Sequence, residues 1–230
     1  MSNAKDCHND LFFCVIIPAY NEEKNIAALI ASIKRYTDNI VVIDDGSQDA
    51  TVEHVKKAGA LCIEHTYNRG KGAALEDGYR YARDNGFQYV LTMDGDGQHS
   101  PDDIPKFIET IKTTGADIIV GNRMDDTHEM PILRYLTNKF TSWVISILAG
   151  QKIYDTQCGY RMAATKVFSD VIMTTHNYDS ESEILVKASR AGYTISSVSI
   201  QTIYGERKSN IRPFRDGIRF FSLVFRLMFK

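Results

Sequence analysis

Short apolar runs alternate with segments of helical periodicity along the first half of the chain. The runs are rich in strand-forming residues and occupy residues 12–17, 39–44, 60–65, 89–94 and 117–122. Between them, apolar residues recur at helical spacing over residues 22–36, 49–58, 71–85 and 101–113. Strands and helices that alternate at this interval form βαβ units. The sequence therefore predicts an α/β fold with a mostly parallel central sheet and helices on both faces.

Size and charge narrow the class of protein. With 230 residues, 43% of them apolar and 24% charged, the chain is long enough for one globular domain with a sizeable core. A net charge of −2 gives no general attraction to nucleic acid, and none is expected as a partner. The cysteines lack C-x-x-C spacing, which argues against a zinc site or a disulfide framework and favours a reducing compartment.

Four of the predicted strands end in polar segments. Ligands of such sheets bind beyond the carboxyl ends of the strands. The segments are "PAYNEE" at 18–23, "DDGSQD" at 44–49, "DGDGQHSPDD" at 94–103 and "GNR" at 121–123. Polar residues follow most strands, but four acidic or amide-rich ends on one edge of a sheet predict a binding site there.

Two acids of the third segment, Asp94 and Asp96, stand one residue apart between glycines. Residues i and i+2 of an extended segment point the same way, so both carboxylates are expected to face one cation that cancels their repulsion. Gly95 and Gly97 permit a tight turn and a close approach to a ligand. Gln98 offers a further oxygen. Oxygen ligands with open positions suit Mg²⁺ or Mn²⁺ bound to a substrate's phosphates.

The residues after this pair have structural explanations. Ser100 is predicted to cap a helix, with Pro101 at the first helical position and Asp102 and Asp103 in the first turn. His99 is interpreted as a surface residue that forms hydrogen bonds rather than as a metal ligand.

Five motifs, in their order and spacing, make the chain resemble the inverting family two glycosyltransferases, and among them the dolichyl- or polyprenyl-phosphate sugar transferases. The motifs are "VIIPAYNEEKNI", "VVIDDGSQDAT", "NRGKGAAL", "MDGDGQH" and "DTQCGYRM". The resemblance implies a GT-A, Rossmann-like fold with residues 11–210 as the catalytic domain. It implies a nucleotide-diphosphate sugar of the GDP-mannose or UDP-glucose type as donor, Mg²⁺ or Mn²⁺ at the Asp-x-Asp pair, and a lipid-linked phosphate as acceptor.

By this resemblance, the donor nucleoside contacts residues that follow the first two strands. Tyr20 offers an aromatic face, and Glu22 and Asp45 offer acceptors for base N–H groups or ribose hydroxyls. Glu22 has an alternative explanation as an acid that the dipole favours in a first helical turn. The donor-binding residues implied are Pro18, Tyr20, Glu22, Ile43, Asp45, Lys71, Asp94, Gly95, Arg123 and Lys208.

Two basic segments are expected to meet the donor's phosphates. In "NRGKGAAL", at residues 68–75, glycines lead into a helix whose free N–H groups suit a phosphate, with Arg69 and Lys71 as charge partners. The segment lacks the full P-loop pattern, and a purely structural helix start is the alternative. Arg123 matches a family arginine whose forked geometry suits a phosphate.

Lys208 matches a family lysine near the diphosphate. The chain departs from the eukaryotic pattern six residues earlier, where Thr202 replaces an arginine. One diphosphate contact is therefore in doubt, although Arg207 could substitute.

The residues implied for catalysis are Asp96, Arg123 and Asp155. Inversion is an in-line displacement in which the metal stabilises charge on the departing diphosphate. Asp155 is the candidate general base if the acceptor is a hydroxyl group. If the acceptor is a phosphate, which is already ionised, Asp155 is interpreted as an organiser of the sugar or of Arg161. Cys158 in the same motif is interpreted as a packing residue.

The C-terminal segment, residues 211–230, is predicted to form a basic amphipathic helix. Arginine and lysine recur there at helical spacing opposite a broad apolar and aromatic face, a pattern typical of helices that lie in a lipid interface. A helix packed on its own domain is the alternative. No run is long enough to span a bilayer, and residues 1–10 form a polar tail without a signal peptide. We expect a cytoplasmic protein held peripherally at the cytoplasmic face of a membrane.

A second apolar stripe occupies residues 131–150, "PILRYLTNKFTSWVISILAG". Its apolar residues repeat at helical spacing, which is compatible with a core helix or with a helix that faces lipid.

Other activities remain open at this stage. The enzyme could act on a saccharide hydroxyl in cell-envelope polysaccharide synthesis. A D-x-D phosphatase or phosphotransferase would use Asp94 as a nucleophile, but Gln98 stands where that class expects Thr or Val. A non-catalytic nucleotide-binding module is the third alternative. The oligomeric state is not indicated by the sequence.

Overall fold

The structure is a computed structural model that describes residues 11–228 except 126, 128–129, 176–178, 202 and 204–212, and only the backbone of 213–219. Its seven strands are β1 (Phe13–Ala19), β2 (Ile40–Asp44), β3 (Leu61–Glu64), β4 (Tyr89–Thr92), β5 (Ile118–Asn122), β6 (Arg161–Ala164) and β7 (Ile195–Ser199). The helices are α1 (Ile26–Ile33), α2 (Thr51–Lys57), α3 (Lys71–Asp84), the 3₁₀ turn η1 (Pro101–Asp103), α4 (Ile104–Thr114), α5 (Ile132–Ala149), α6 (Val167–Asp170), α7 (Ser180–Arg190) and α8 (Pro213–Met228).

The strands form one sheet in the order β3-β2-β1-β4-β6-β5-β7. Strand β6 runs antiparallel to both of its neighbours, and every other pairing is parallel. The prediction of a mostly parallel α/β sheet is confirmed. The five predicted strands occur to within two residues at each end, whereas β6 and β7 were not predicted.

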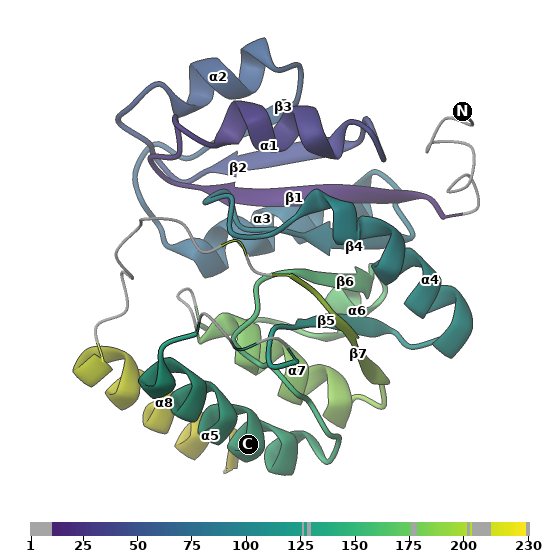
Figure 1. Ribbon diagram of the computed structural model, residues 1–230, viewed down its shortest axis with the longest axis vertical. Coiled ribbons are helices and arrows are strands. Elements are labelled where there is room, and N and C mark those ends of the chain that lie inside the picture. The colour runs from purple at the N-terminus through teal and green to yellow at the C-terminus, as the bar shows by residue number, and fades with distance from the viewer. Residues whose placement is uncertain are drawn as a thin grey trace.

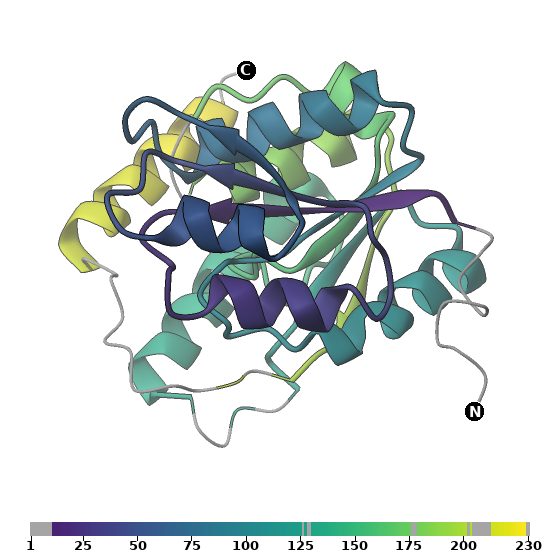
Figure 2. The same ribbon diagram turned by 90° about the horizontal axis from the view of Figure 1, so that it is seen from above.

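Helices cover both faces of the sheet, as Figures 1 and 2 show. Helices α1, α2 and α4 lie on one face, and α3 and α6 lie on the other. Helices α5, α7 and α8 pack together beside the β5–β7 end of the sheet.

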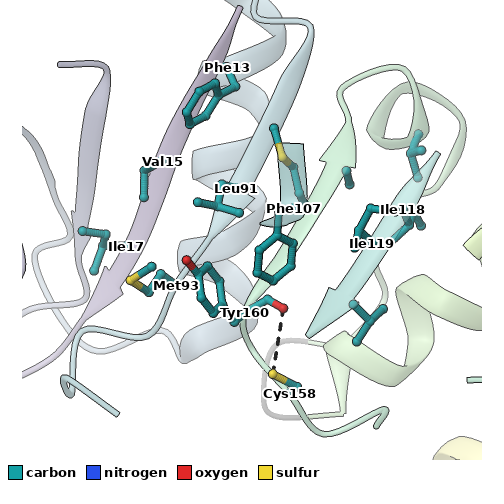
Figure 3. Packing of buried hydrophobic residues seen from close by; sticks show 14 of the residues in the cluster. Phe13, Val15, Ile17, Leu91, Met93, Phe107, Ile118, Ile119, Cys158 and Tyr160 are labelled. Atoms are coloured by element: carbon teal, nitrogen blue, oxygen red, sulfur yellow. Dashed lines mark hydrogen bonds between the residues drawn. The ribbon is translucent and has the colours of Figure 1, made fainter. Parts of the chain in front are cut away.

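The core is built from alternating side chains of the central strands. Val15 and Ile17 of β1 face the helices α1 and α4, and Figure 3 shows Val15 beside Leu91 and Ile17 beside Met93. Cys14 and Ile16 point to the opposite face, toward α3. Each fully buried Val or Ile side chain contributes about 1.5–3 kcal/mol. These contacts fix the position of the strand ends that carry the polar segments.

The helix after β4 begins as the sequence predicts. Ser100 accepts a hydrogen bond from the Asp102 backbone N–H at 3.3 Å, and Pro101 occupies the first position. Asp102 pairs with Arg35 at 2.7 Å, and buried Asp103 accepts from the Gln201 backbone N–H at 3.1 Å. Both acids therefore have structural roles.

Candidate active site

Asp94 and Asp96 lie just beyond the carboxyl end of β4, which pairs in parallel with β1. Asp94 Oδ1 lies 2.6 Å from Lys71 Nζ. Asp96 Oδ1 accepts the Gln98 backbone N–H at 3.0 Å, and the Asp96 carbonyl accepts from Asn25 Nδ2 at 3.2 Å. The turn is therefore fixed by backbone contacts, which leaves the second carboxylate oxygen of Asp96 for other use.

The two carboxylates influence each other's charge. Burial and then the negative charge of Asp94 raise the pKa of Asp96. Burial would also raise the pKa of Asp94, but the positive charge of Lys71 outweighs it and holds this pKa below its usual range. Two acids that repel each other across a short turn gain most from a cation between them. Within the described residues, no group of three or more His, Cys, Asp or Glu side chains is arranged to hold a metal.

The oxygen donors fit Mg²⁺ or Mn²⁺, which use one or two carboxylates and leave positions for waters and phosphates. Asp94 and Asp96 would supply the carboxylates, and the Gln98 side chain is the third candidate donor.

His99 corrects a prediction from the sequence. It is buried rather than at the surface, with 3% of its area exposed, and its ring packs on Tyr160 at 5.2 Å between centroids. Burial lowers its pKa to about 4, so the ring is neutral at physiological pH. His99 Nε2 lies 3.9 Å from Asp94 Oδ2, so the buried ring adjoins the carboxylate pair.

Lys71 and Glu181 join the site from two helices. Lys71 is the first residue of α3, and its Nζ lies 2.8 Å from Glu181 Oε1 in the first turn of α7. Glu181 was missed in the sequence. Sequence spacing does not reveal it, because its partner Lys71 lies on another helix, far away in the sequence.

Three of the predicted donor contacts meet on one side of the carboxylate pair. A Cβ atom on Gly95 would lie 3.4 Å from both Glu22 Cγ and the Pro18 carbonyl oxygen, so these residues adjoin each other. Glu22 precedes α1, which begins at Ile26 and has no acid in its first turn. The alternative explanation of Glu22 as a first-turn acid is therefore wrong.

A hollow of about 300 Å³ opens beyond the ends of β1, β2 and β3. It is lined by Tyr20, Asp44, residues 46–48, Val52 and residues 64–68. Gly46, at φ 76°, allows this wall to be tight, because a Cβ there would lie 2.7 Å from the Tyr67 backbone carbon. The polar hollow and the Asp-x-Asp turn are reached from the same edge of the sheet.

Asp45 faces inward rather than into this hollow. Its carboxylate accepts the backbone N–H groups of Arg69 and Gly70, both at 2.8 Å, and contacts His65 Nδ1 at 2.7 Å. In this arrangement Asp45 anchors the 66–70 loop that leads into α3. Ile43 lies wholly in the core beneath. Direct contacts of Asp45 and Ile43 with a donor remain predictions.

His65 was missed by sequence reasoning. Its Nε2 lies 2.8 Å from Asp77 Oδ2, so the ring links β3 to α3 as well as to Asp45. No local motif signals this link, because the two acids lie 20 and 12 residues away.

Arg123 and Asp155 form a buried, two-pronged ion pair. Arg123 Nε and Nη2 donate to the two carboxylate oxygens at 2.7 and 3.0 Å. Burial would raise the pKa of Asp155, but the charge and hydrogen bonds of Arg123 outweigh it and lower this pKa. Asp155 thus organises Arg123.

Arg161 has other partners. Its guanidinium donates to the backbone carbonyls of Thr156, Cys158 and Glu181 at 2.9, 2.8 and 2.6 Å. This corrects the interpretation of Asp155 as an organiser of Arg161. Cys158 is fully buried, as the packing interpretation expects, and burial raises the pKa of its thiol to about 12. Lys208, Thr202 and Arg207 lie outside the described residues.

The α5 apolar face, defined here as Leu133, Leu136, Phe140, Trp143 and Ile147, is exposed, with 60% of Trp143 accessible. A second exposed set, the α8 apolar face, consists of Phe221, Phe225 and Met228. On the other side of α8, Leu223 and Leu227 are buried in the core. Helix α8 therefore packs on the domain through one stripe and exposes another. Among the described residues, no helix is both long and apolar enough to cross a bilayer.

The sequence of the chain is similar to those of known sugar transferases. A family model described as "Glycosyl transferase family 2" matches residues 14–172. The chain is 33% identical over 221 residues to the UDP-N-acetylglucosamine--dolichyl-phosphate N-acetylglucosaminyltransferase of Methanococcus voltae, which covers 86% of this chain and 88% of the relative. It is 34% identical over 208 residues to the dolichyl-phosphate hexose transferase of Haloferax volcanii, with 88% of each chain covered.

The fold is also found among solved structures. Glucosyl-3-phosphoglycerate synthase of Mycobacterium tuberculosis, in complex with Mn²⁺, UDP-glucose and phosphoglyceric acid, matches with a TM-score of 0.72. The match covers 97% of this chain and 82% of that chain at 17% identity. At this identity the likeness establishes the shared fold, in agreement with the predicted GT-A architecture.

Proposed function

This chain belongs to glycosyl transferase family 2 and is a sugar-transferring enzyme, and from that premise we propose its donor, metal and acceptor. It transfers a sugar from a nucleotide-diphosphate sugar to a polyprenyl- or dolichyl-phosphate-like lipid, with Mg²⁺ or Mn²⁺ at Asp94 and Asp96. Family membership removes the phosphatase and the non-catalytic module from consideration.

The observation that carries the donor and metal proposal is a carboxylate pair at the same edge of the sheet as a polar hollow. Asp94 and Asp96 stand at the end of β4, and the hollow beyond β1–β3 has about 300 Å³, a volume at the lower end of the range of small-molecule pockets. Asp94, Asp96 and Gln98 would hold the metal, which would stabilise charge on the leaving diphosphate. The M. tuberculosis synthase was solved with Mn²⁺ and UDP-glucose, which supports this class of donor.

The ion pair between Arg123 and Asp155 favours a phosphate acceptor. Asp155 is fully buried, and its pKa is held below the usual range, so it is a poor acceptor of a hydroxyl proton at neutral pH. A phosphate needs no such base, because it is already ionised and attacks through its own oxygen. The M. voltae relative is named for transfer to dolichyl phosphate, which supports the same class of acceptor.

Two exposed apolar surfaces support a peripheral position on a membrane. The α5 and α8 apolar faces belong to helices that pack against each other (Figure 1). Arg134 and Lys139 of α5 and Arg226 of α8 add positive charge to the same helices. Aromatic and basic side chains together are typical of surfaces that sit in a lipid interface. A membrane-bound enzyme would reach a lipid-linked acceptor directly.

The proposal is tested by turnover of UDP-GlcNAc, UDP-glucose and GDP-mannose, each with Mn²⁺ or Mg²⁺ and with or without polyprenyl phosphate. We expect release of nucleoside diphosphate that requires both the lipid phosphate and the metal and that stops when EDTA is added. Turnover that depends on an added oligosaccharide instead would assign a saccharide hydroxyl as the acceptor. Turnover that is unchanged by EDTA would refute the metal role.

A further inference from the structure

The ammonium group of Lys71 stands between two carboxylates from different parts of the fold. Its Nζ lies 2.6 Å from Asp94 Oδ1 and 2.8 Å from Glu181 Oε1. Only 17% of the lysine side chain and 8% of the Glu181 side chain are exposed. An ammonium group in contact with two carboxylates keeps its positive charge.

The backbone of the 155–159 loop closes a further side of this cluster. A Cβ atom on Gly159 would lie 2.7 Å from Asp94 Oδ2 and 2.9 Å from Lys71 Nζ. The loop, α3 and the end of β4 therefore hold the ammonium group against the carboxylate that the metal would use.

One carboxylate oxygen cannot serve both cations equally well. A divalent ion binds its oxygen ligands at about 2.0–2.1 Å, and at such range its charge repels a nearby ammonium group strongly. Removing a lysine from a buried acid without replacement is also unfavourable, because the acid loses its compensating charge. Glu181, on a different helix, offers the lysine a second partner.

We propose that Lys71 is the resident counter-ion of the metal site, and that Glu181 receives it when a divalent ion binds Asp94. This inference rests on the proposed metal role of Asp94 and Asp96. Lys71 competes with the metal when no donor is present, and the donor's diphosphate adds negative charge that offsets the two cations. The metal and the donor should therefore bind cooperatively, each strengthening the other by the same factor.

Substitutions of Lys71 and of Glu181 should change the affinity for Mn²⁺ in opposite directions. Lys71→Met keeps the apolar stem and removes the charge, so Mn²⁺ should bind about tenfold more tightly in the absence of nucleotide, within the usual range of such couplings. Glu181→Gln removes the second partner, so the lysine stays on Asp94 and Mn²⁺ should bind several-fold more weakly. Lys106→Met is the control and should leave Mn²⁺ affinity unchanged, because Lys106 of α4 forms an ion pair of the same length, 2.6 Å, with Asp103 of η1.

The experiment is titration of Mn²⁺ into the full chain, with and without UDP, followed by calorimetry or by the paramagnetic resonance signal of free Mn²⁺. The double variant Lys71→Met/Glu181→Gln removes both charges together and covers the case in which a single variant does not fold. It should bind Mn²⁺ more tightly than the wild type. The Mn²⁺ affinity of the wild type should rise with UDP, and that of Lys71→Met should rise less.

Unchanged or weaker Mn²⁺ binding in both variants that lack Lys71, in a protein whose wild type binds Mn²⁺, would overturn the counter-ion role alone. A wild type that binds no Mn²⁺ even with UDP present would overturn the proposed metal site and the inference together.

Discussion

Arg123 and Asp155 are both buried, and each is the other's main charge partner. Only 5% of Arg123 and none of Asp155 is exposed to solvent. The Asp155 carboxylate also accepts the backbone N–H groups of Arg123 and Gln157 at 3.3 and 3.2 Å. The pair joins the end of β5 to the 155–159 loop, and so ties this loop to the sheet.

The Asp155→Asn variant leaves the Arg123 charge buried without its partner. We expect the free energy of unfolding to fall by about 3–5 kcal/mol, as is usual when one member of a buried pair is removed. Urea denaturation followed by circular dichroism measures this change. The control is Arg35→Gln, which breaks the exposed pair with Asp102 and should cost less than about 1 kcal/mol. Equal losses in the two variants would contradict the assignment.

The ionised carboxylate of Glu183 should make the free energy of unfolding depend on pH in the acid range. Its buried carboxylate accepts from the Thr175 backbone N–H at 2.9 Å and pairs with Lys187 at 2.6 Å. Burial would raise its pKa, but the hydrogen bonds from Lys187, Thr174 and Thr175 lower it to about 2. A lowered folded pKa means stability that is complete above the unfolded value of 4.5 and is lost as pH falls toward about 2.

The measurement is urea denaturation of the wild type and Glu183→Gln from pH 6 to pH 3. The variant should be less stable at pH 6, and the difference should shrink as pH falls through this window. A difference that stays constant with pH would show that the Glu183 charge does not contribute.

Single residues could be predicted from the sequence when their signal is local. The Ser100 cap was predicted correctly because spacing within a few residues defines it. Asp94 and Asp96 were singled out by the same kind of local spacing, and their role in metal binding stays a prediction. Glu181 and His65 were missed because their partners lie far away in the sequence, and only the packing of helices on the sheet brings them together. His99 was misplaced because a polar residue beside a cap gives no local sign of burial.

At the scale of elements, the predicted strands share one property, a continuous apolar run, and all of them except β3 at the edge of the sheet are mostly buried. Strand β7 has no such run, because three of its five residues are serines. Strand β6 has four residues and depends on pairing between β4 and β5. Such strands are specified by their neighbours rather than by their own pattern.

The 155–159 loop lies close to the end of β4 and to the start of α3, and Gly159 is the point of contact. Gly159→Ala places a methyl group within 2.9 Å of Lys71 Nζ and closer to both Asp94 oxygens, so the ion pair must shift. We expect affinity for a nucleotide with Mn²⁺ to fall about tenfold while the protein remains folded. Calorimetry measures the affinity, and thermal melting checks the fold.

Gly121→Ala is the matched comparison, since its methyl group would meet Ile200 Cδ1 at 2.8 Å and the Tyr160 carbonyl at 3.0 Å. It should lower the melting temperature more than Gly159→Ala does. Nucleotide affinity that is unaffected by Gly159→Ala would show that the loop has room to move.

At the scale of the whole molecule, two exposed apolar faces lie on the neighbouring helices α5 and α8. The α5 stripe, which the sequence left open between core and lipid, is on the surface. Helix α8 packs on its own domain through Leu223 and Leu227, as one alternative for the C-terminus expects, and it also exposes Phe221 and Phe225. Contact of this exposed side with lipid stays a prediction. Truncation of α8 would uncover the core, so point substitutions separate membrane binding from folding.

The last prediction concerns binding to vesicles that contain anionic lipid. Trp143→Ser and Phe225→Ser each remove an exposed aromatic ring, with 60% and 66% of the residue accessible. Because burial of such a ring in lipid is worth about 2 kcal/mol, the double variant should lose at least about tenfold in its partition coefficient. Added salt should weaken the binding of the wild type to these vesicles, since screening reduces the attraction of basic residues to anionic lipid.

Co-sedimentation with the vesicles measures the effect of the substitutions and the effect of salt. The control is Phe12→Ser, which removes an exposed aromatic ring next to Phe13, the first residue of β1. The start of β1 lies across the molecule from α8 in Figure 1, so this variant should bind as the wild type does. If the wild type, the Trp143→Ser/Phe225→Ser double variant and Phe12→Ser sediment equally with vesicles, the two faces do not contact lipid.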